Sequence, residues 1–389
     1  MAADFSYIAA FAQKLVRTPS QAGIDDCTAI VETAAEYARD LGLPVVTVPD
    51  DAGKPVALVA EIRGGHPGKT WAVNATLDTA PVGDLSQWKE DPFSGAIRDG
   101  FLYGRGAADS KLAAALFMHL AKDLQERQEN MHGNFLLILD ADEHTGNFGG
   151  IKAALNAGFK PDGIMIGYPG DDKIVVGSRG FSRYEIVLTG KGAHSGASLP
   201  AQDNPLVRIA DIVQALSANQ PVTEADPEFD KQPKVTVTQI EGGGGFSVVP
   251  TQALARVDVR LTPAFNEAAA DRHIRNIVAQ HDLNHQVPEA RASVVNKVSS
   301  EPAFLTPELA ELRKAMREAV LEITGTALPE FIAGPSNIGN HLARQGIEVT
   351  AGYGVPAKGV HAPDERANLR PLPKIYDVYR KALQKLLQT

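Results

Sequence analysis

Hydrophobic and polar positions follow two different periods along the first 175 residues of the chain. Apolar residues recur at helical spacing near 5–16, 26–41, 110–125 and 148–158, whereas apolar runs at 71–77, 134–142 and 163–168 are typical of buried strands. Strands separated by amphipathic helices predict an α/β fold with a mostly parallel sheet and helices on both faces. Ligands of such sheets bind at the carboxyl ends of the strands, so we expect the functional site there.

The pattern changes at about residue 181. The segment ALARVDVRL at 253–261 alternates between apolar and charged residues from Ala255 onward, and it follows a helical pattern at 204–217 and a strand pattern at 234–240. Helix and strand patterns of the first type return at 306–325, 348–354 and 373–388. We therefore expect a catalytic α/β domain made of residues 1–180 and 298–389, with a small α+β domain inserted at 181–297.

Charge and composition narrow the partners. The net charge is −9 over 389 residues and the basic residues form no run, which argues against binding to nucleic acid or to an anionic membrane. The N-terminus lacks the cationic start of a signal peptide, and no apolar segment is long enough to span a bilayer. A single cysteine is consistent with a reducing compartment, so the expected location is cytoplasmic.

Acidic and imidazole side chains collect at strand ends and in one loop. Asp78 lies in TLDTAP, Asp109 in GRGAADSK, Glu143 and His144 in LDADEHTG, and His361 in GVHAPDE. Each follows an apolar strand or lies in a loop with Gly or Pro, and such residues are ligands of catalytic metals. Taken alone, Asp109 could equally be the N-cap of the helix that follows it.

Together and in this order, the segments resemble the metallopeptidase and deacylase family of acetylornithine deacetylase, succinyl-diaminopimelate desuccinylase and glutamate carboxypeptidase, the M20-like peptidases. That family carries HxDxxP, GRGxxDxKG, DEE and G-[ED]-P segments, then a histidine in an inserted domain and a late histidine before a PDE-like stretch. Here GRGAADSK, DADEH, GKGAHSG, VDVRLTP and HAPDE match, over essentially the whole chain. The resemblance implies a metal-dependent hydrolase of C–N bonds that works as a homodimer, with the inserted domain as dimerisation domain and lid.

The resemblance also implies roles for particular residues. Asp109 falls on a carboxylate that bridges two metals, His361 on a ligand of the second metal, and Glu143 on the general base that takes a proton from the attacking water. His194 falls on the inserted-domain histidine that reaches a neighbouring active site and stabilises the developing oxyanion. Arg260 falls on an arginine that often binds a substrate carboxylate, so we expect a small-molecule substrate that carries one.

The chain departs from the family pattern at the first metal. Thr76 stands at the position of the histidine in HxDxxP, and Tyr168 stands at the position of the carboxylate in G-[ED]-P. Both ligands that bind only the first metal are therefore missing, and Asp78 has lost the imidazole that it would orient. His144 stands at the second glutamate of DEE. Two imidazoles and a carboxylate suit a single Zn²⁺ or Mn²⁺ per chain, and also Fe²⁺. The expected ligands are Asp109, His144 and His361.

Further departures affect the substrate pocket. Ser247 replaces the asparagine of an FNxIP segment and Asn337 the aspartate of a GTSD-like loop, and we expect both to bind substrate together with Arg260, Tyr168 and Thr76. These changes favour an unusual substrate, such as an activated aromatic amine of the nitroanthranilate type. Two alternatives stay open: a conventional N-acyl amino acid deacylase or dipeptidase, and a non-catalytic binding protein on a decayed hydrolase scaffold.

Overall fold

The chain forms two compact units, described here from a computed structural model that covers residues 5–224 and 226–389. Unit 1 runs to Gly177 and continues with Leu305–Phe331 and Asn337–Thr389, whereas unit 2 comprises Ser178–Phe304 and Ile332–Ser336. The short second passage through unit 2 differs from the single insertion expected at 181–297. It is held by hydrogen bonds within unit 2, from Arg179 Nε to Gly334 O (2.9 Å) and from Arg260 Nη1 to Ser336 Oγ (3.1 Å).

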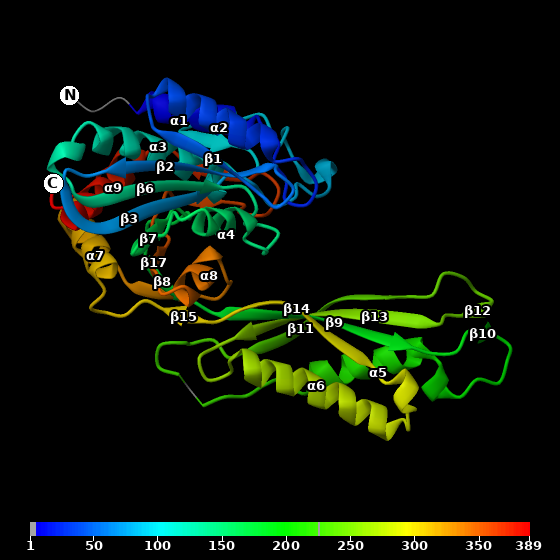
Figure 1. Ribbon diagram of the computed structural model, residues 1–389. Helices are drawn as coiled ribbons and strands as arrows, with labels where there is room; N and C mark the ends of the chain where they lie inside the picture. Colours follow the sequence, from blue (N-terminus) through cyan, green and yellow to red (C-terminus); the bar gives the residue numbers. More distant parts are fainter. Residues whose placement is uncertain (1–4, 225) are drawn as a thin grey trace. The chain divides into compact units, whose positions relative to one another are not determined.

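The α-helices of the described residues, labelled in Figure 1, have the following bounds: α1 Ser6–Val16, α2 Thr28–Asp40, α3 Leu112–Gln125, α4 Gly149–Asn156, α5 Pro205–Ala218, α6 Glu267–Asn284, α7 Glu311–Thr324, α8 Ile338–Arg344 and α9 Leu372–Leu387. The strands are β1 Val45–Pro49, β2 Pro55–Arg63, β3 His66–Thr76, β4 Ile97–Arg98, β5 Phe101–Tyr103, β6 His132–Asp140, β7 Gly163–Ile166, β8 Ile174–Ser178, β9 Gly180–Thr189, β10 Ala193–His194, β11 Lys234–Gly242, β12 Val248–Val249, β13 Gln252–Leu261, β14 Val294–Glu301, β15 Phe304–Leu305, β16 Glu330–Ala333, β17 Glu348–Ala351, β18 Ala357–Lys358 and β19 Arg366–Asn368.

Unit 1 is built on a sheet of order β1-β2-β6-β3-β7-β17. The pairs β6–β3, β3–β7 and β7–β17 are parallel, and β1 and β2 form an antiparallel edge. Trp71 and Val73 of β3 face a core shared with α1, α2, α3, α7 and α9, and α4 lies on the opposite side of the sheet from α1 and α2 (Figure 1). Burial on both faces explains the continuous apolar runs of β3 and β6 in the sequence.

Unit 2 contains an antiparallel sheet of order β11-β13-β9-β14. Alternate residues of β9 and β13, such as Ile186 and Val257, are buried against apolar residues of α5 and α6, while the residues between them are more exposed. One covered face and one open face produce the alternating pattern seen in ALARVDVRL. The predicted fold class, a mostly parallel α/β sheet with an inserted α+β domain, is confirmed.

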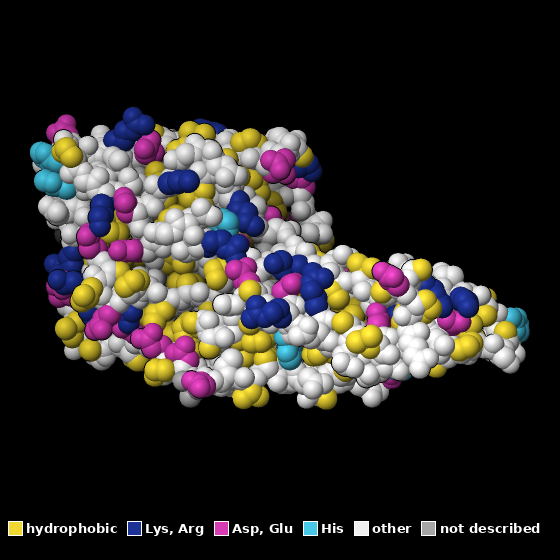
Figure 2. Space-filling model, turned by 60° about the horizontal axis from the view of Figure 1, so that its bottom comes forward, with side chains coloured by type: hydrophobic (Ala, Val, Ile, Leu, Met, Phe, Trp, Pro, Cys, Tyr) yellow, Lys and Arg dark blue, Asp and Glu magenta, His cyan; other side chains and the backbone are white. Residues whose placement is uncertain are grey.

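The helices and the surface charges bear on the expectation that the chain binds neither membranes nor nucleic acid. Among the described residues, no helix is both long enough and apolar enough to cross a membrane. On the face shown in Figure 2, acidic and basic side chains are interspersed. Such a mixture differs from the continuous basic stripe that nucleic-acid-binding proteins present.

Candidate metal centre

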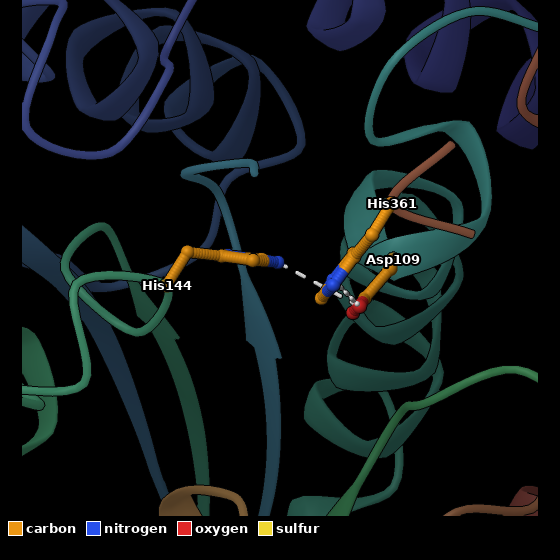
Figure 3. Close-up of side chains that lie close together, drawn as sticks. All are labelled: Asp109, His144 and His361. Atoms are coloured by element: carbon orange, nitrogen blue, oxygen red, sulfur yellow. Dashed lines mark hydrogen bonds and ion pairs between the residues drawn. The ribbon is translucent and has the colours of Figure 1, made fainter. Parts of the chain in front are cut away.

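Asp109, His144 and His361 come together in unit 1 at the carboxyl end of the sheet. Asp109 lies just before α3, His144 follows β6, and His361 lies in the loop between β18 and β19. Their ligand atoms all lie within 4.8 Å of one another. Nε2 of His361 is 3.0 Å and Nε2 of His144 is 3.6 Å from Oδ2 of Asp109, and the three side chains point toward one another (Figure 3). The alternative that Asp109 caps α3 is wrong, because the N-cap is Lys111 and no side chain caps that end.

The donor set fits a divalent cation. Both ring nitrogens of His144 and Oδ1 of Asp109 are buried and have no hydrogen-bond partner within residues 5–224 and 226–389. Buried polar atoms without partners cost free energy, so a group that satisfies them stabilises the site. Two imidazoles and one carboxylate with open coordination positions are suited to Zn²⁺ or Mn²⁺.

The charges of the ligands support each other. Burial raises the pKa of Asp109, but the neighbouring imidazoles of His144 and His361 outweigh this effect. The pKa of Asp109 therefore lies below its usual value. Burial lowers the pKa of His144, but the carboxylates of Asp109 and Asp78 outweigh this effect. The pKa of His144 therefore lies well above its usual value. A cation that binds the imidazole takes the place of that proton, which makes binding dependent on pH.

Asp78 is tied to the segment that carries His144. Its fully buried carboxylate accepts hydrogen bonds from the backbone N–H groups of Glu143 (3.1 Å) and His144 (2.9 Å). Oδ2 of Asp78 also lies 3.4 Å from Nδ1 of His144. The expectation that Asp78 has no imidazole to orient is therefore wrong. A carboxylate close to the second nitrogen of a ligand histidine favours one orientation of the ring. The Asp78 carboxylate lies at ion-pair distance from Nδ1 of His144 but makes no hydrogen bond with it.

Glu143 lies beside the ligands and is held by Tyr168. The phenol of Tyr168 donates a hydrogen bond of 2.8 Å to Oε1 of Glu143, and Oε2 lies 3.4 Å from Nδ1 of His144. Burial raises the pKa of Glu143 to about 7, although His144 and Tyr168 oppose this. Burial and the neighbouring carboxylates raise the pKa of Tyr168 well above its usual value, so the phenol remains a donor. A carboxyl group with a pKa near neutrality can both accept and return a proton.

A buried ion pair that sequence reasoning missed fixes the loop of Asp109. Oε1 of Glu365 accepts hydrogen bonds from the N–H groups of Ala108 (3.1 Å) and Asp109 (3.3 Å), and Oε2 lies 2.6 Å from Nη1 of Arg105. Both charged side chains are only 1% exposed. Arg105 and Glu365 stand in the GRGAADSK and HAPDE segments, and this joint occurrence was the signal that could have revealed them.

Thr76 and Asn337 lie in unit 1 and already have partners. Thr76 is fully buried, with Oγ1 3.3 Å from Oγ of Ser110. Asn337 is the N-cap of α8, and its Oδ1 accepts a hydrogen bond of 2.8 Å from the N–H of Gly339. Their expected contact with substrate stays a prediction.

His194, Ser247 and Arg260 lie in unit 2, apart in the chain from the ligands. His194 is exposed in β10, where its Nδ1 accepts a hydrogen bond of 3.1 Å from the N–H of Gly196. Ser247 accepts a backbone hydrogen bond of 2.9 Å from Ser195. Nε of Arg260 lies 2.8 Å from Oδ1 of Asp258. Their roles in catalysis and binding also stay predictions.

Comparisons with known proteins agree with the fold. The model of peptidase family M20/M25/M40 matches residues 72–385. A succinyl-diaminopimelate desuccinylase of Rhodospirillum centenum is 28% identical, over 97% of this chain and 96% of the relative. An M20 family metallo-carboxypeptidase of Sulfolobus solfataricus has a similar structure, with a TM-score of 0.75 and 21% identity over 98% of this chain and 99% of the other.

A dinuclear metal-binding M20 peptidase of Bacillus subtilis is also similar in structure, with a TM-score of 0.71 and 17% identity over 99% of this chain and 100% of the other. At this identity the likeness concerns the fold alone. The family model, in contrast, covers well over half of the chain. The chain therefore belongs to peptidase family M20/M25/M40, as a metal-dependent hydrolase acting on C–N bonds.

Proposed function

We propose that this chain hydrolyses the amide bond of a small N-acyl amino acid or dipeptide, with one divalent cation bound by Asp109, His144 and His361. The observation that carries the proposal is Glu143, whose carboxylate lies directly beside this cluster and has a pKa of about 7. Membership of a peptidase and deacylase family favours this conventional class over the deamination of an aromatic amine.

The residues of the chain divide the work among them. A divalent cation at the three ligands would supply Lewis acidity, which acidifies water and polarises the scissile carbonyl. Glu143 accepts the proton that leaves the attacking water and gives it to the departing nitrogen, so the proton is conserved over the cycle. Tyr168 holds Oε1 of Glu143, Asp78 orients His144, and Glu365 fixes the backbone at Asp109.

The surroundings of Thr76 and Tyr168 support the proposal of one cation rather than two. These residues occupy the two positions where the family places ligands private to the other metal, and neither is ionised. The Thr76 hydroxyl lies against Ser110, and the Tyr168 phenol donates to Glu143. Asp78 uses its carboxylate on two backbone N–H groups. A second ion would have only Asp109 as an anionic ligand, fewer than the three protein ligands usual for catalytic zinc.

The proposal extends to the residues that bind the substrate and to the oligomeric state of the protein. Arg260 has a partly exposed guanidinium group that suits a substrate carboxylate, and Ser247 and Asn337 supply polar groups of the kind that fix orientation. His194 is exposed, so it is available to the active site of a second copy. We therefore propose a homodimer in which unit 2 acts as dimerisation domain and lid.

A substrate panel tests the reaction class. The full chain, loaded with Zn²⁺ or Mn²⁺, is assayed against N-succinyl and N-acetyl amino acids, dipeptides and nitroanthranilates. Release of an amino acid from an acylated substrate or dipeptide is expected, and the same protein with Glu143→Gln serves as control. Ammonia release from nitroanthranilates alone would overturn the amide class. Metal binding without any turnover would favour a binding protein on a decayed scaffold.

A further inference from the structure

Unit 2 contains a second cluster of metal-ligand side chains, between α5 and α6. His281 and His285 are four residues apart at the end of α6, so they project from one side of the helix, and their rings stack with centroids 4.3 Å apart. Asp211 of α5 brings Oδ2 to 3.3 Å from Nε2 of His285. Ligand atoms of all three residues lie within 4.8 Å of one another. None of these residues belongs to the catalytic cluster.

The carboxylate of Asp282 orients the imidazole ring of His281. The residue is 6% exposed, and its Nδ1 lies 3.4 Å from Oδ1 of Asp282. Asp282 is itself fixed, because Oδ1 accepts hydrogen bonds from Arg208 (2.9 Å) and the Ser293 hydroxyl (2.8 Å). A neutral imidazole that turns its Nδ1–H to this carboxylate presents a lone pair on Nε2.

The other nitrogen of His281 lacks a partner. Nε2 is buried and makes no hydrogen bond within the part of the chain that the structure describes. Leaving a buried polar atom unpaired costs free energy, so such an atom calls for a ligand. Asp211, His281 and His285 also line one pocket, together with Asn219, Gln280 and Asn284. His285 and Asp211 are partly exposed, which leaves a path for an ion.

We propose that Asp211, His281 and His285 form a zinc-binding site that joins α5 to α6. Two imidazole nitrogens and one carboxylate oxygen are a ligand set for Zn²⁺, and three protein ligands leave at least one coordination position for water. The site links the last turn of α6 to the facing side of α5 through polar groups at the edge of the hydrophobic core. An ion that binds only the folded chain stabilises it, so Zn²⁺ strengthens unit 2.

The experiment counts zinc in the full chain without the catalytic ligands. The parent variant carries His144→Ala and His361→Ala, and bound zinc is measured by mass spectrometry after dialysis against Zn²⁺. Adding His285→Ala or Asp211→Asn is expected to remove one zinc equivalent per chain. Adding His273→Ala, which changes a histidine on the same helix outside the cluster, is expected to remove none.

Two readouts keep the result clear. Zn²⁺ is expected to raise the Tm of the parent and of the His273→Ala variant, but not of the His285→Ala variant. Because the catalytic substitutions could disturb folding, His285→Ala is also made alone, and it is expected to bind one zinc fewer than the unsubstituted chain. Equal zinc counts with and without His285→Ala, or equal losses in His285→Ala and His273→Ala, would overturn the proposal.

Discussion

Replacing Glu143 with glutamine is expected to lower kcat by about 10²–10⁴-fold, the range that a general base contributes. The substitution removes the group that accepts the proton but keeps an oxygen that can accept the hydrogen bond of Tyr168. Metal content and Tm are expected to stay the same, because Glu143 is not one of the three clustered ligands. Steady-state kinetics on the best substrate of the panel, with metal analysis of the same sample, measures this.

A companion substitution separates the base from its support. Tyr168→Phe removes only the hydroxyl that donates to Glu143, and this hydrogen bond lowers the pKa of Glu143. Without it the pKa of Glu143 rises, so the base becomes protonated at a higher pH and the acidic limb of the kcat profile moves to higher pH.

A Glu143→Gln enzyme that keeps its kcat within about threefold, below the range for a general base, would contradict the assignment of Glu143 as the base.

Replacing Glu365 with glutamine is expected to lower the free energy of unfolding by about 3–5 kcal/mol, because it leaves Arg105 as a buried charge without its partner. Both side chains are 1% exposed, and Nη1 of Arg105 lies 2.6 Å from the carboxylate. The same carboxylate fixes the N–H groups of Ala108 and Asp109, so metal affinity is also expected to fall. Urea denaturation and a zinc titration measure the two effects.

An exposed ion pair supplies the matched control. Glu311 lies 2.7 Å from Lys69, and the two side chains are 59% and 47% exposed. Because solvent screens such a pair, Glu311→Gln is expected to change the free energy of unfolding by at most about 1 kcal/mol. Glu365→Gln and Glu311→Gln with equal, small losses of stability would contradict the role given to the buried pair.

Much of the fold could be predicted because its physical causes are local. The strands β3 and β6 are buried on both faces and read as apolar runs, while β13 is covered on one face and alternates. The antiparallel edge β1–β2 was not predicted. A run such as VALVAEI has the composition of a strand, but periodicity alone gives neither its direction nor its neighbour.

Only the site residues that stand in sequence motifs could be predicted. Asp109, His144 and His361 stand in recognisable segments, and the structure brings them together. The contacts that support them join distant positions: Asp78 binds the backbone of His144, and Glu365 binds that of Asp109. Which distant polar groups meet is decided by the packing of the sheet and its loops, so one sequence could not show that Asp78 lies beside a different histidine.

Anomalous X-ray diffraction from zinc-loaded crystals, recorded at the zinc edge, tests the central claim most directly. We predict a single anomalous peak at the catalytic centre, bonded to Asp109, His144 and His361, at the Zn–N and Zn–O distances of about 2.0–2.2 Å. Any peak at Asp211, His281 and His285 lies in unit 2 and is counted separately. Two peaks bridged by Asp109, or none among the three ligands, would contradict the account.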